Sequence, residues 1–432
     1  MAMPDAGGSE EDRTSGDRSY FRTLRIFLAA RFAVATAWQI QAVAVGWYVY
    51  ALTDSALDLG LIGLVQFAPM VGLALPAGHI VDRYARRSIA IIAYTIEGLS
   101  SVALAAMALW GAGSADAVFA VIFACGIGRA FEQPSMQSWL PTLVPGHAFP
   151  RIAASNSLTA QSAVIVGPAL GGLLYLVAPF VPFAVAAAFQ LGGIAAILCL
   201  PSRPGSGGQP LSWNSLLGGV RFIWQSEAVL GMIALDFWCV LFGGAVALMP
   251  IFARDILGTG PAGLGMLRSA PALGAFVMGL ALTRRPPVRR VGRRLLITVA
   301  VYGAATLAFG LSRSFALSCA ALVVVGASDM LSVVIRSTMV QVVAPNAIRG
   351  RVTAITSLFT GASNQLGQFE SGVTAAWLGP VASVVLGGAA TLLIVVLWVR
   401  RFPAVGRMDR LVMPEASVDR PRAAVPGSPT SC

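Results

Sequence analysis

The chain has 432 residues, of which 56% are hydrophobic and only 11% are charged, and its formal net charge is +11. Soluble domains carry about 25% charged residues, so this composition excludes a soluble globular protein. The 30 basic residues are all arginine. The chain therefore has no P-loop lysine and no Schiff-base lysine, which argues against ATP as its energy source.

Apolar stretches recur along the chain from residue 22 to residue 401. A helix that crosses the hydrocarbon core needs about 20 mostly apolar residues. The sequence predicts twelve such spans, at 24–50, 58–80, 88–110, 115–138, 152–177, 180–200, 228–252, 262–283, 294–312, 314–338, 351–376 and 380–401.

Arginine is distributed unevenly over the connectors. The N-terminal segment, the connectors after the second, eighth and tenth spans, and the C-terminal end hold most of it, whereas the opposite side has only Arg254 and Arg313. Because cytoplasmic loops are enriched in arginine, this predicts a multi-pass protein of the cell inner membrane with both termini in the cytoplasm. The basic residues lie at helix ends and form no soluble basic face, so no nucleic-acid partner is expected.

The chain divides into two repeated halves. Residues 60–72 align with 262–274 at an offset of 202, and residues 126–158 align with 326–358 at an offset of 200. The sequence therefore predicts an all-α integral membrane protein with 12 transmembrane helices in two pseudo-symmetric six-helix halves, with substrate bound between them near the midplane.

The flanking and linking segments are polar. Residues 22–200 form the first half and 228–401 the second, and residues 201–227 form a cytoplasmic linker with an amphipathic helix, in which apolar residues recur at helical spacing after a Pro/Gly/Ser-rich run. Residues 1–21, which lack the apolar core of a signal peptide, and residues 402–432 are predicted to be disordered cytoplasmic tails.

Two motifs connect this pattern to a known family. Residues 78–87 read GHIVDRYARR and resemble the GxxxDRxxRR signature of the major facilitator superfamily between its second and third spans. Residues 167–172 read GPALGG and resemble the core of the antiporter motif of its proton-coupled exporters. Segments 38–69, 131–145 and 363–380 are similar to its enterobactin-exporter and drug:proton antiporter branch.

The resemblance covers about residues 22–411 and departs from the family pattern twice. Ala163 replaces an upstream glycine of the antiporter motif, and the loop 284–294 of the second half keeps arginines but has no aspartate. This implies one well-formed cytoplasmic latch, which closes the cytoplasmic side in the outward-facing state. The latch residues would be Gly78, Asp82, Arg83, Arg86 and Arg87. The alternative is that the arginines only fix topology.

The glycines of the second motif remove side chains from one helix face, so that neighbouring helices can pack closely. They are Gly167, Gly171 and Gly172, and Pro168 can kink the same helix. The resemblance adds that this contact controls leak and direction of transport.

Charged residues inside the predicted spans are the candidate coupling residues, because a charge at the bilayer centre costs about 2.5–3.5 kcal/mol. Asp236, Glu132 and Asp329 are the first candidates for carrying protons, followed by Glu97 and Glu370. Arg129 lies three residues before Glu132, which predicts that the two share a helix face, and it aligns with Asp329 at the offset of 200. We therefore expect these two residues to pair in one transport state, or to form a static ion pair. The remaining arginines in the spans are Arg31, Arg268 and Arg336.

The resemblance implies that spans 1, 4, 7 and 10 surround a central cavity. Trp38, Gln39 and Gln41 are candidate cavity residues of the first span, with lipid contact or core packing as the alternative.

The first functional hypothesis is a secondary active transporter, working as a monomer, that exports small amphipathic molecules (drug or siderophore-like) by proton antiport and alternating access. Its energy would come from the proton gradient, without a cofactor. A proton-coupled importer or facilitator is the alternative. A membrane-embedded sensor or enzyme is disfavoured, because only His79 and His147 could supply histidine to a metal cluster and no nucleophile–base pair is recognisable.

Overall fold

The computed structural model describes residues 10–111, 113–143, 149–201, 221–285, 290–345 and 348–403. All the regular elements in these ranges are helical. The first half contains α1 (Glu10–Thr53), α2 (Ala56–Gly72), α3 (Ala74–Arg83), α4 (Arg86–Trp110), α5 (Ala115–Leu143), α6 (Phe149–Val177) and α7 (Val181–Leu198). The second half contains α9 (Glu227–Phe242), η2 (Ala245–Leu248), α10 (Met249–Ile251), the π-helix η3 (Phe252–Ile256), α11 (Gly260–Arg284), α12 (Val291–Leu311), α13 (Phe315–Val343), α14 (Arg349–Leu378) and α15 (Pro380–Arg401).

Among the described residues, nine helices are long and apolar enough to cross a membrane, or ten if the bent pair α2 and α3 forms one broken span. Helices α5 and α14 have 29 and 30 residues but are more polar, with Arg129 and Glu132 in the one and Gln368 and Glu370 in the other. The described helices thus confirm an all-α membrane fold, while apolar length alone supports nine or ten of the twelve predicted spans.

The structure bears on three predicted boundaries: the start of the first span, the course of the second span, and the linker with the C-terminal tail. Helix α1 already begins at Glu10, within the segment 1–21 for which disorder is predicted. The second span breaks near Leu73 with a bend of 54°, because Pro69 and Gly72 both weaken the helix there. The amphipathic helix expected in the linker and the tail 402–432 lie mostly outside the described residues.

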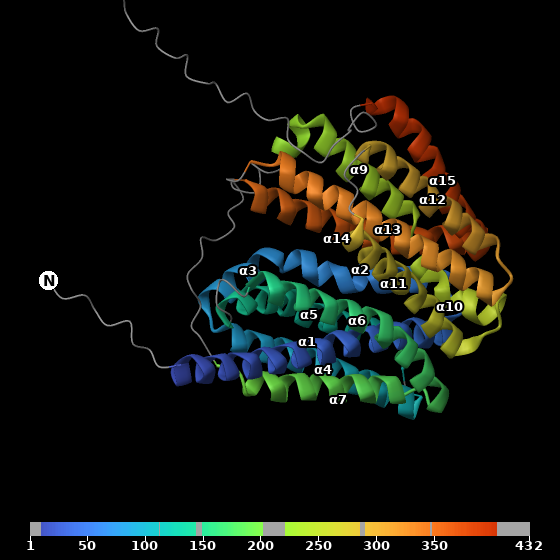
Figure 1. Ribbon diagram of the computed structural model, residues 1–432. Helices are drawn as coiled ribbons and strands as arrows, with labels where there is room; N and C mark the ends of the chain where they lie inside the picture. Colours follow the sequence, from blue (N-terminus) through green and yellow to red (C-terminus); the bar gives the residue numbers. More distant parts are fainter. Residues whose placement is uncertain are drawn as a thin grey trace, which may run out of the picture.

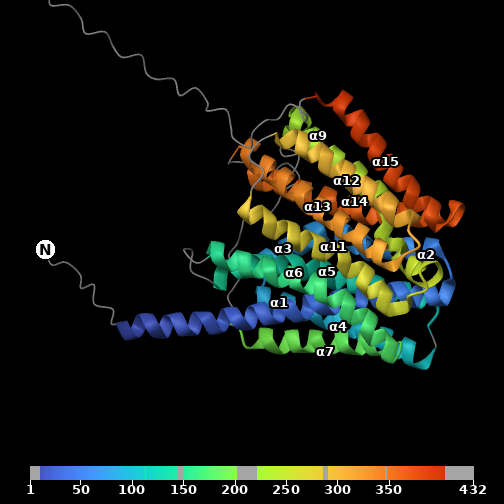
Figure 2. The same ribbon diagram turned by 45° about the vertical axis from the view of Figure 1, so that its right-hand side comes forward.

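The two halves form separate layers. Figure 1 shows α1 to α7 in one layer and α9 to α15 in the other. The end of the bundle that carries the start of α1 and the end of α15 is called the proximal end below, and the opposite end is the distal end. Figure 2 shows the first turns of α1 extending beyond the helices beside it at the proximal end.

The sequence repeat is also a structural repeat. Pro69 on α2 packs against Gly126 on α5, and Pro271 on α11 packs against Gly326 on α13, so the two halves use equivalent residues for the same contact. In each case a Cβ atom on the glycine would collide with the neighbouring helix.

The halves meet along two related helix pairs, α6 with α11 and α2 with α14. A Cβ atom on Gly172 would lie 3.0 Å from the Gly265 Cα atom, and one on Gly60 would lie 3.0 Å from the Gly372 Cα atom. Within the first half, Gly167 and Gly171 pack against α1. The GPxxGG segment therefore lies where three helices approach backbone to backbone.

A valine at Gly172 should disrupt this contact. Its side chain would meet the Pro261 carbonyl and the Gly265 backbone, which cannot move aside like a side-chain end. We expect a loss of about 1–3 kcal/mol of stability, seen as a lower midpoint of thermal unfolding of the purified protein in detergent. Gly192→Val is the control, because a Cβ atom there meets nothing within 4 Å. Equal midpoints for the two variants would contradict the role of Gly172 in close packing.

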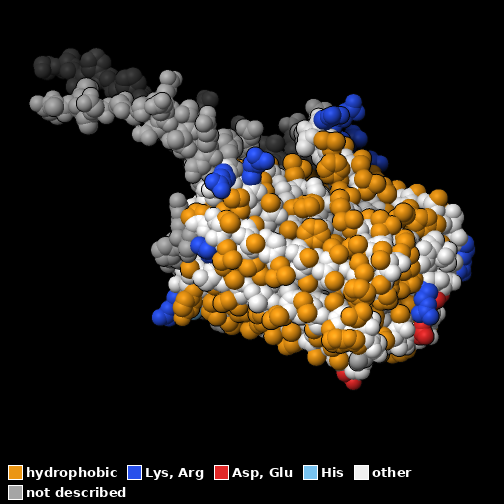
Figure 3. Space-filling view, turned by 90° about the horizontal axis from the view of Figure 1, so that it is seen from below, with side chains coloured by type: hydrophobic (Ala, Val, Ile, Leu, Met, Phe, Trp, Pro, Cys, Tyr) orange, Lys and Arg blue, Asp and Glu red, His pale blue; other side chains and the backbone are white. Residues whose placement is uncertain are grey.

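The surface is that of a membrane protein. Figure 3 shows apolar side chains over most of the visible face, with the arginines toward its edges. Trp110 and Trp377 are among the most exposed apolar residues, and both lie at the distal ends of their helices. Tryptophan is enriched at the membrane–water interface, so these residues mark the distal boundary of the bilayer.

Candidate transport site

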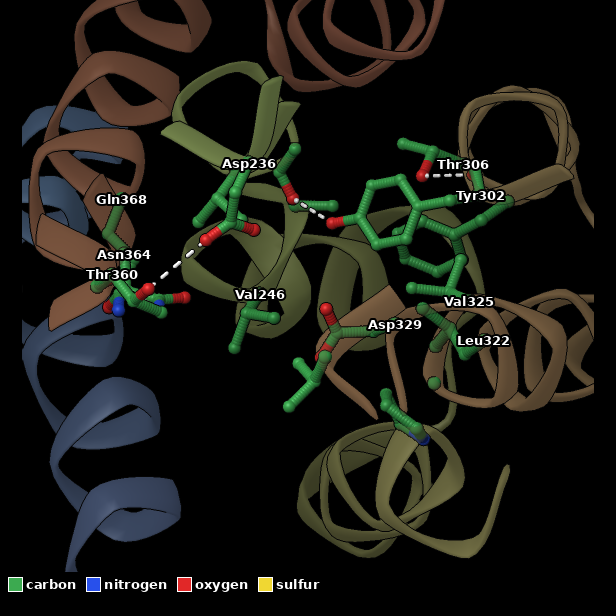
Figure 4. Close-up of a pocket in the computed structure, with 18 of the residues that line it drawn as sticks. Asp236, Val246, Tyr302, Thr306, Leu322, Val325, Asp329, Thr360, Asn364 and Gln368 are labelled. Atoms are coloured by element: carbon green, nitrogen blue, oxygen red, sulfur yellow. Dashed lines mark hydrogen bonds between the residues drawn. The ribbon is translucent and has the colours of Figure 1, made fainter. Parts of the chain in front are cut away.

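A cavity of about 240 Å³ lies within the second half, among α9, η2, α12, α13 and α14. Figure 4 shows Asp236 and Asp329 on opposite sides of it, with Tyr302 nearby. Its other polar side chains are Thr306, Arg336, Thr360, Asn364 and Gln368. The cavity thus combines apolar walls with a few convergent polar groups, which is typical of a small-molecule site.

Asp236 on α9 forms an ion pair with Arg336 on α13. The Thr360 hydroxyl on α14 also donates to Asp236 Oδ2 at 3.1 Å. Both charged side chains are almost buried. Because each charge has its partner, this pair can exist inside the bundle, and it ties three helices of the second half together.

Asp329 differs from Asp236. It lies on α13 two turns before Arg336, on the same helix face, and its side chain is exposed to the cavity. Among the described residues it has neither an ion pair nor a hydrogen bond. A carboxyl group in this position is free to bind a proton or a cationic group.

In the first half, Glu132 on α5 is fully buried and pairs with two arginines. Arg31 on α1 contacts one carboxylate oxygen, and Arg129, one turn earlier on α5, contacts the other at 2.9 Å. The Arg129 guanidinium also lies 4.2 Å from the centre of the Trp38 ring. This cluster contains two positive charges and one negative charge.

Arg129 therefore does not pair with Asp329 in this conformation. The prediction that Arg129 and Glu132 share a helix face is confirmed, and this proximity explains the choice of partner. The equivalent sequence positions of Arg129 and Asp329 do not produce contact, because each side chain remains within its own half.

Two predicted residues of the first half lie in its interior. Glu97 on α4 is fully buried, and neither of its carboxylate oxygens has a hydrogen-bond partner. Gln41 is also buried. Its Oε1 atom lies 3.0 Å from the Ser101 hydroxyl, which in turn lies 2.8 Å from Gln190 Oε1. Gln41 is thus part of a core hydrogen-bond network.

The remaining predicted site residues that the structure describes lie outside both the second-half cavity and the Glu132 cluster. Gln39 packs against Gly167. Glu370 lies near the distal end of α14, beside the Ser371 hydroxyl at 3.5 Å. In the 78–87 motif, Arg87 donates to the Leu198 carbonyl at 2.7 Å within the first half. Asp82 is half-buried, and no described residue pairs with it.

At the distal end, two polar contacts connect the halves. The Tyr50 hydroxyl on α1 donates to Asp255 on η3. Asp54, which follows α1, pairs with Arg254 at 2.7 Å. We call these four residues the distal latch. The sequence analysis treats Arg254 only as a connector residue, and no sequence pattern revealed the π-helix that presents Arg254 and Asp255.

A family model described as "Transmembrane secretion effector" matches residues 18–425. The chain belongs to this family of the major facilitator superfamily. It is therefore a membrane transporter, and the resemblance seen in its motifs is confirmed.

Curated relatives and solved structures agree with this assignment. Enterobactin exporter EntS of Escherichia coli O1:K1 / APEC is 28% identical over 380 residues, 86% of this chain and 90% of the relative. The protein of that name from Shigella boydii serotype 18 is 27% identical over 378 residues, with the same coverage.

The fold also matches crystal structures at lower identity. The nucleoside transporter NupG has a TM-score of 0.67 at 15% identity, over 88% of this chain and 98% of that chain. A bacterial homologue of the human lysosomal transporter Spinster, in an inward-facing and unoccupied conformation, has a TM-score of 0.68 at 15% identity, over 90% and 96%. These likenesses show the fold alone.

The packing of the transporter indicates which end is closed. One buried apolar cluster near the distal end joins residues of both halves, among them Val43 and Leu59 from the first and Leu248, Phe252 and Leu264 from the second. The buried clusters nearer the proximal end, within the described residues, each belong to a single half. The distal side is thus sealed by apolar packing as well as by the distal latch.

A second cavity, of about 320 Å³, lies between α13 and α14 on the proximal side. Val333, Arg336 and Thr360 line both this cavity and the one around Asp329. The shared lining indicates a route from the proximal end toward Asp329.

Proposed function

We propose that the transporter exports a small amphipathic molecule, drug or siderophore-like, in exchange for protons. Its curated relatives carry the name of an enterobactin exporter, and its GPxxGG segment resembles the antiporter motif. Export takes place across the cell inner membrane, and the proximal end, where arginine is concentrated, faces the cytoplasm. The described conformation is then the one that loads substrate from the cytoplasm.

The observation that carries this proposal is the unpaired Asp329 beside the Asp236–Arg336 ion pair. Asp329 receives a proton when the distal end is open and releases it when the proximal end is open. Substrate competes with the proton for the same cavity, so that each half-cycle carries one or the other. The ion pair keeps Arg336 from neutralising Asp329.

The two ends alternate. In the described state the distal latch is formed and Asp82 has no partner among the described residues. In the opposite state the distal latch opens and the 78–87 loop closes the proximal end, as its motif resemblance implies. The two latches thus exclude each other.

The test uses energised everted membrane vesicles that contain the protein. We expect enterobactin, or members of a panel of amphipathic drugs, to release protons from the vesicles, measured as a collapse of the pH gradient. Vesicles without the protein are the control. If substrate accumulates while the gradient stays intact, proton antiport is wrong. If substrate enters the vesicles only until its concentrations on the two sides are equal and the pH gradient stays intact, the protein is a facilitator.

A weakened distal latch should favour the state that is open at the distal end. Tyr50→Phe combined with Asp54→Asn removes the hydroxyl of one contact and the charge of the other, and because one pair is exposed we expect a shift of roughly fivefold or more in the populations. Cys319, partly buried against the distal apolar cluster, reports this shift through faster alkylation by a maleimide. Cys239, buried within the second half, is the internal control. Unchanged alkylation of Cys319 would contradict a gating role.

A further inference from the structure

Of the four arginines singled out inside the predicted spans, Arg268 is the one that has no acidic partner among the described residues. Arg31, Arg129 and Arg336 each contact a carboxylate. No ion pair or hydrogen bond of Arg268 occurs with any described residue, and its Nε atom is buried without a partner. An unpaired charge in this position is costly, and such charges in membrane proteins mark functional sites.

Arg268 lies between the two halves. It belongs to α11 of the second half, and a Cβ atom placed on Gly46 of α1 would lie 3.9 Å from its Nη2 atom and 3.4 Å from Pro250 on α10. Gly46 precedes Tyr50 by one turn, so the two residues share the face of α1 that meets the second half. The guanidinium therefore lies about one helical turn from the distal latch, on its proximal side.

The nearby acids are not available to Arg268. Asp255 accepts from Tyr50, and Asp54 pairs with Arg254. The Arg268 side chain as a whole is only partly buried, although its Nε atom is enclosed. Its Nη2 atom lies near Gly46 of α1, on the proximal side of the distal latch.

We propose that Arg268 binds an anionic group of the transported molecule, such as a carboxylate. A planar guanidinium with free N–H groups fits a carboxylate in a two-pronged arrangement. Gly46 places no side chain against this guanidinium, so α1 does not cover its Nη2 atom with one. The inference rests on the proposed function in one respect, that a small molecule occupies the space between the halves.

Asp329 and Arg268 then divide the recognition of substrate. Asp329 lies in the cavity of the second half, and Arg268 lies on the proximal side of the distal latch. A molecule with an anionic end and an apolar body places the anionic end at Arg268 and the body in the cavity of Asp329, where it competes with the proton. The transporter should accordingly prefer anionic or zwitterionic amphipathic molecules over otherwise equal neutral ones.

The test is equilibrium binding to the purified full chain in detergent, without a pH gradient. The probes are dansyl-glycine, which carries a carboxylate, and dansyl-glycinamide, which has the same body without the charge. Dansyl fluorescence rises in an apolar site and reports binding. We expect the carboxylate to bind roughly tenfold or more tightly than the amide.

Three variants decide the role of Arg268. Arg268→Gln should remove the preference for dansyl-glycine and leave binding of the amide within about twofold. Arg268→Lys, which keeps the charge, should retain part of it. Arg313→Gln is the control, because it removes an exposed arginine from the same end of the bundle. Each variant is used only as a monodisperse protein.

The proposal is overturned if the wild type binds both probes equally, or binds neither, or if Arg268→Gln weakens both probes alike. It is also overturned if Arg313→Gln has the same effect as Arg268→Gln. Because binding is measured without a gradient, failure here is separate from failure of proton antiport, which only the vesicle experiment detects.

Discussion

Replacement of Asp329 by asparagine is expected to abolish substrate-driven proton release in everted vesicles. Asparagine keeps the shape of the side chain but cannot exchange a proton at neutral pH. Because Asp329 has no partner among the described residues, its replacement breaks no ion pair, and the fold should remain intact. The measurement is the collapse of the pH gradient on addition of substrate, compared with the wild type.

The control is Asp116→Asn, which removes an exposed carboxylate at the start of α5. We expect wild-type proton release from this variant. The Asp329 variant should still bind substrate and let it equilibrate across the membrane, since the cavity is unchanged in shape. Full proton release from Asp329→Asn would move the proton site elsewhere, first to Glu97, whose buried carboxyl also lacks a partner.

Asp236→Asn is a less direct test of proton coupling, although the sequence places Asp236 among the three first candidates. Its carboxylate balances Arg336 and accepts the Thr360 hydroxyl. The substitution would leave Arg336 buried without its partner, so that a loss of transport could reflect a loss of structure. The ion pair across α9 and α13 was not foreseeable from a sequence, because the two residues are a hundred positions apart.

The features that could be predicted are those written locally in the chain. Apolar stretches identified the helices, the arginine distribution predicted an orientation, and the repeat of Pro69 and Pro271 appears as two equivalent helix contacts. The spacing of Arg129 and Glu132 was enough to predict that they share a helix face, since both are on one helix.

The pairing of side chains between helices could not be predicted. Glu132 recruits Arg31 from α1, and the distal latch joins Tyr50 to a π-helix. Such contacts depend on helix rotation and depth to within a few ångströms, which periodicity does not determine. The alignment of Arg129 with Asp329 shows the same limit, because equivalence under the repeat fixes depth but not distance.

Removal of the Glu132 carboxylate should have the largest effect on stability. Glu132→Gln leaves Arg31 and Arg129 without the carboxylate that both of them contact. Loss of one partner from a buried ion pair costs about 3–5 kcal/mol. We expect a clearly lower midpoint of thermal unfolding in detergent, followed as loss of the monodisperse protein. Glu227→Gln, at the exposed start of α9, should leave the midpoint unchanged.

A second substitution separates charge balance from packing. The wild-type cluster has two arginines and one glutamate, so Glu132→Gln raises its net charge by one unit, and Arg31→Gln in the same chain returns it to the original value. Arg129 keeps its contact with the Trp38 ring in both variants. We therefore expect the double variant to unfold at a higher temperature than Glu132→Gln alone. If it unfolds at the same or a lower temperature, the carboxylate stabilises α1 and α5 through its hydrogen bonds and not through its charge.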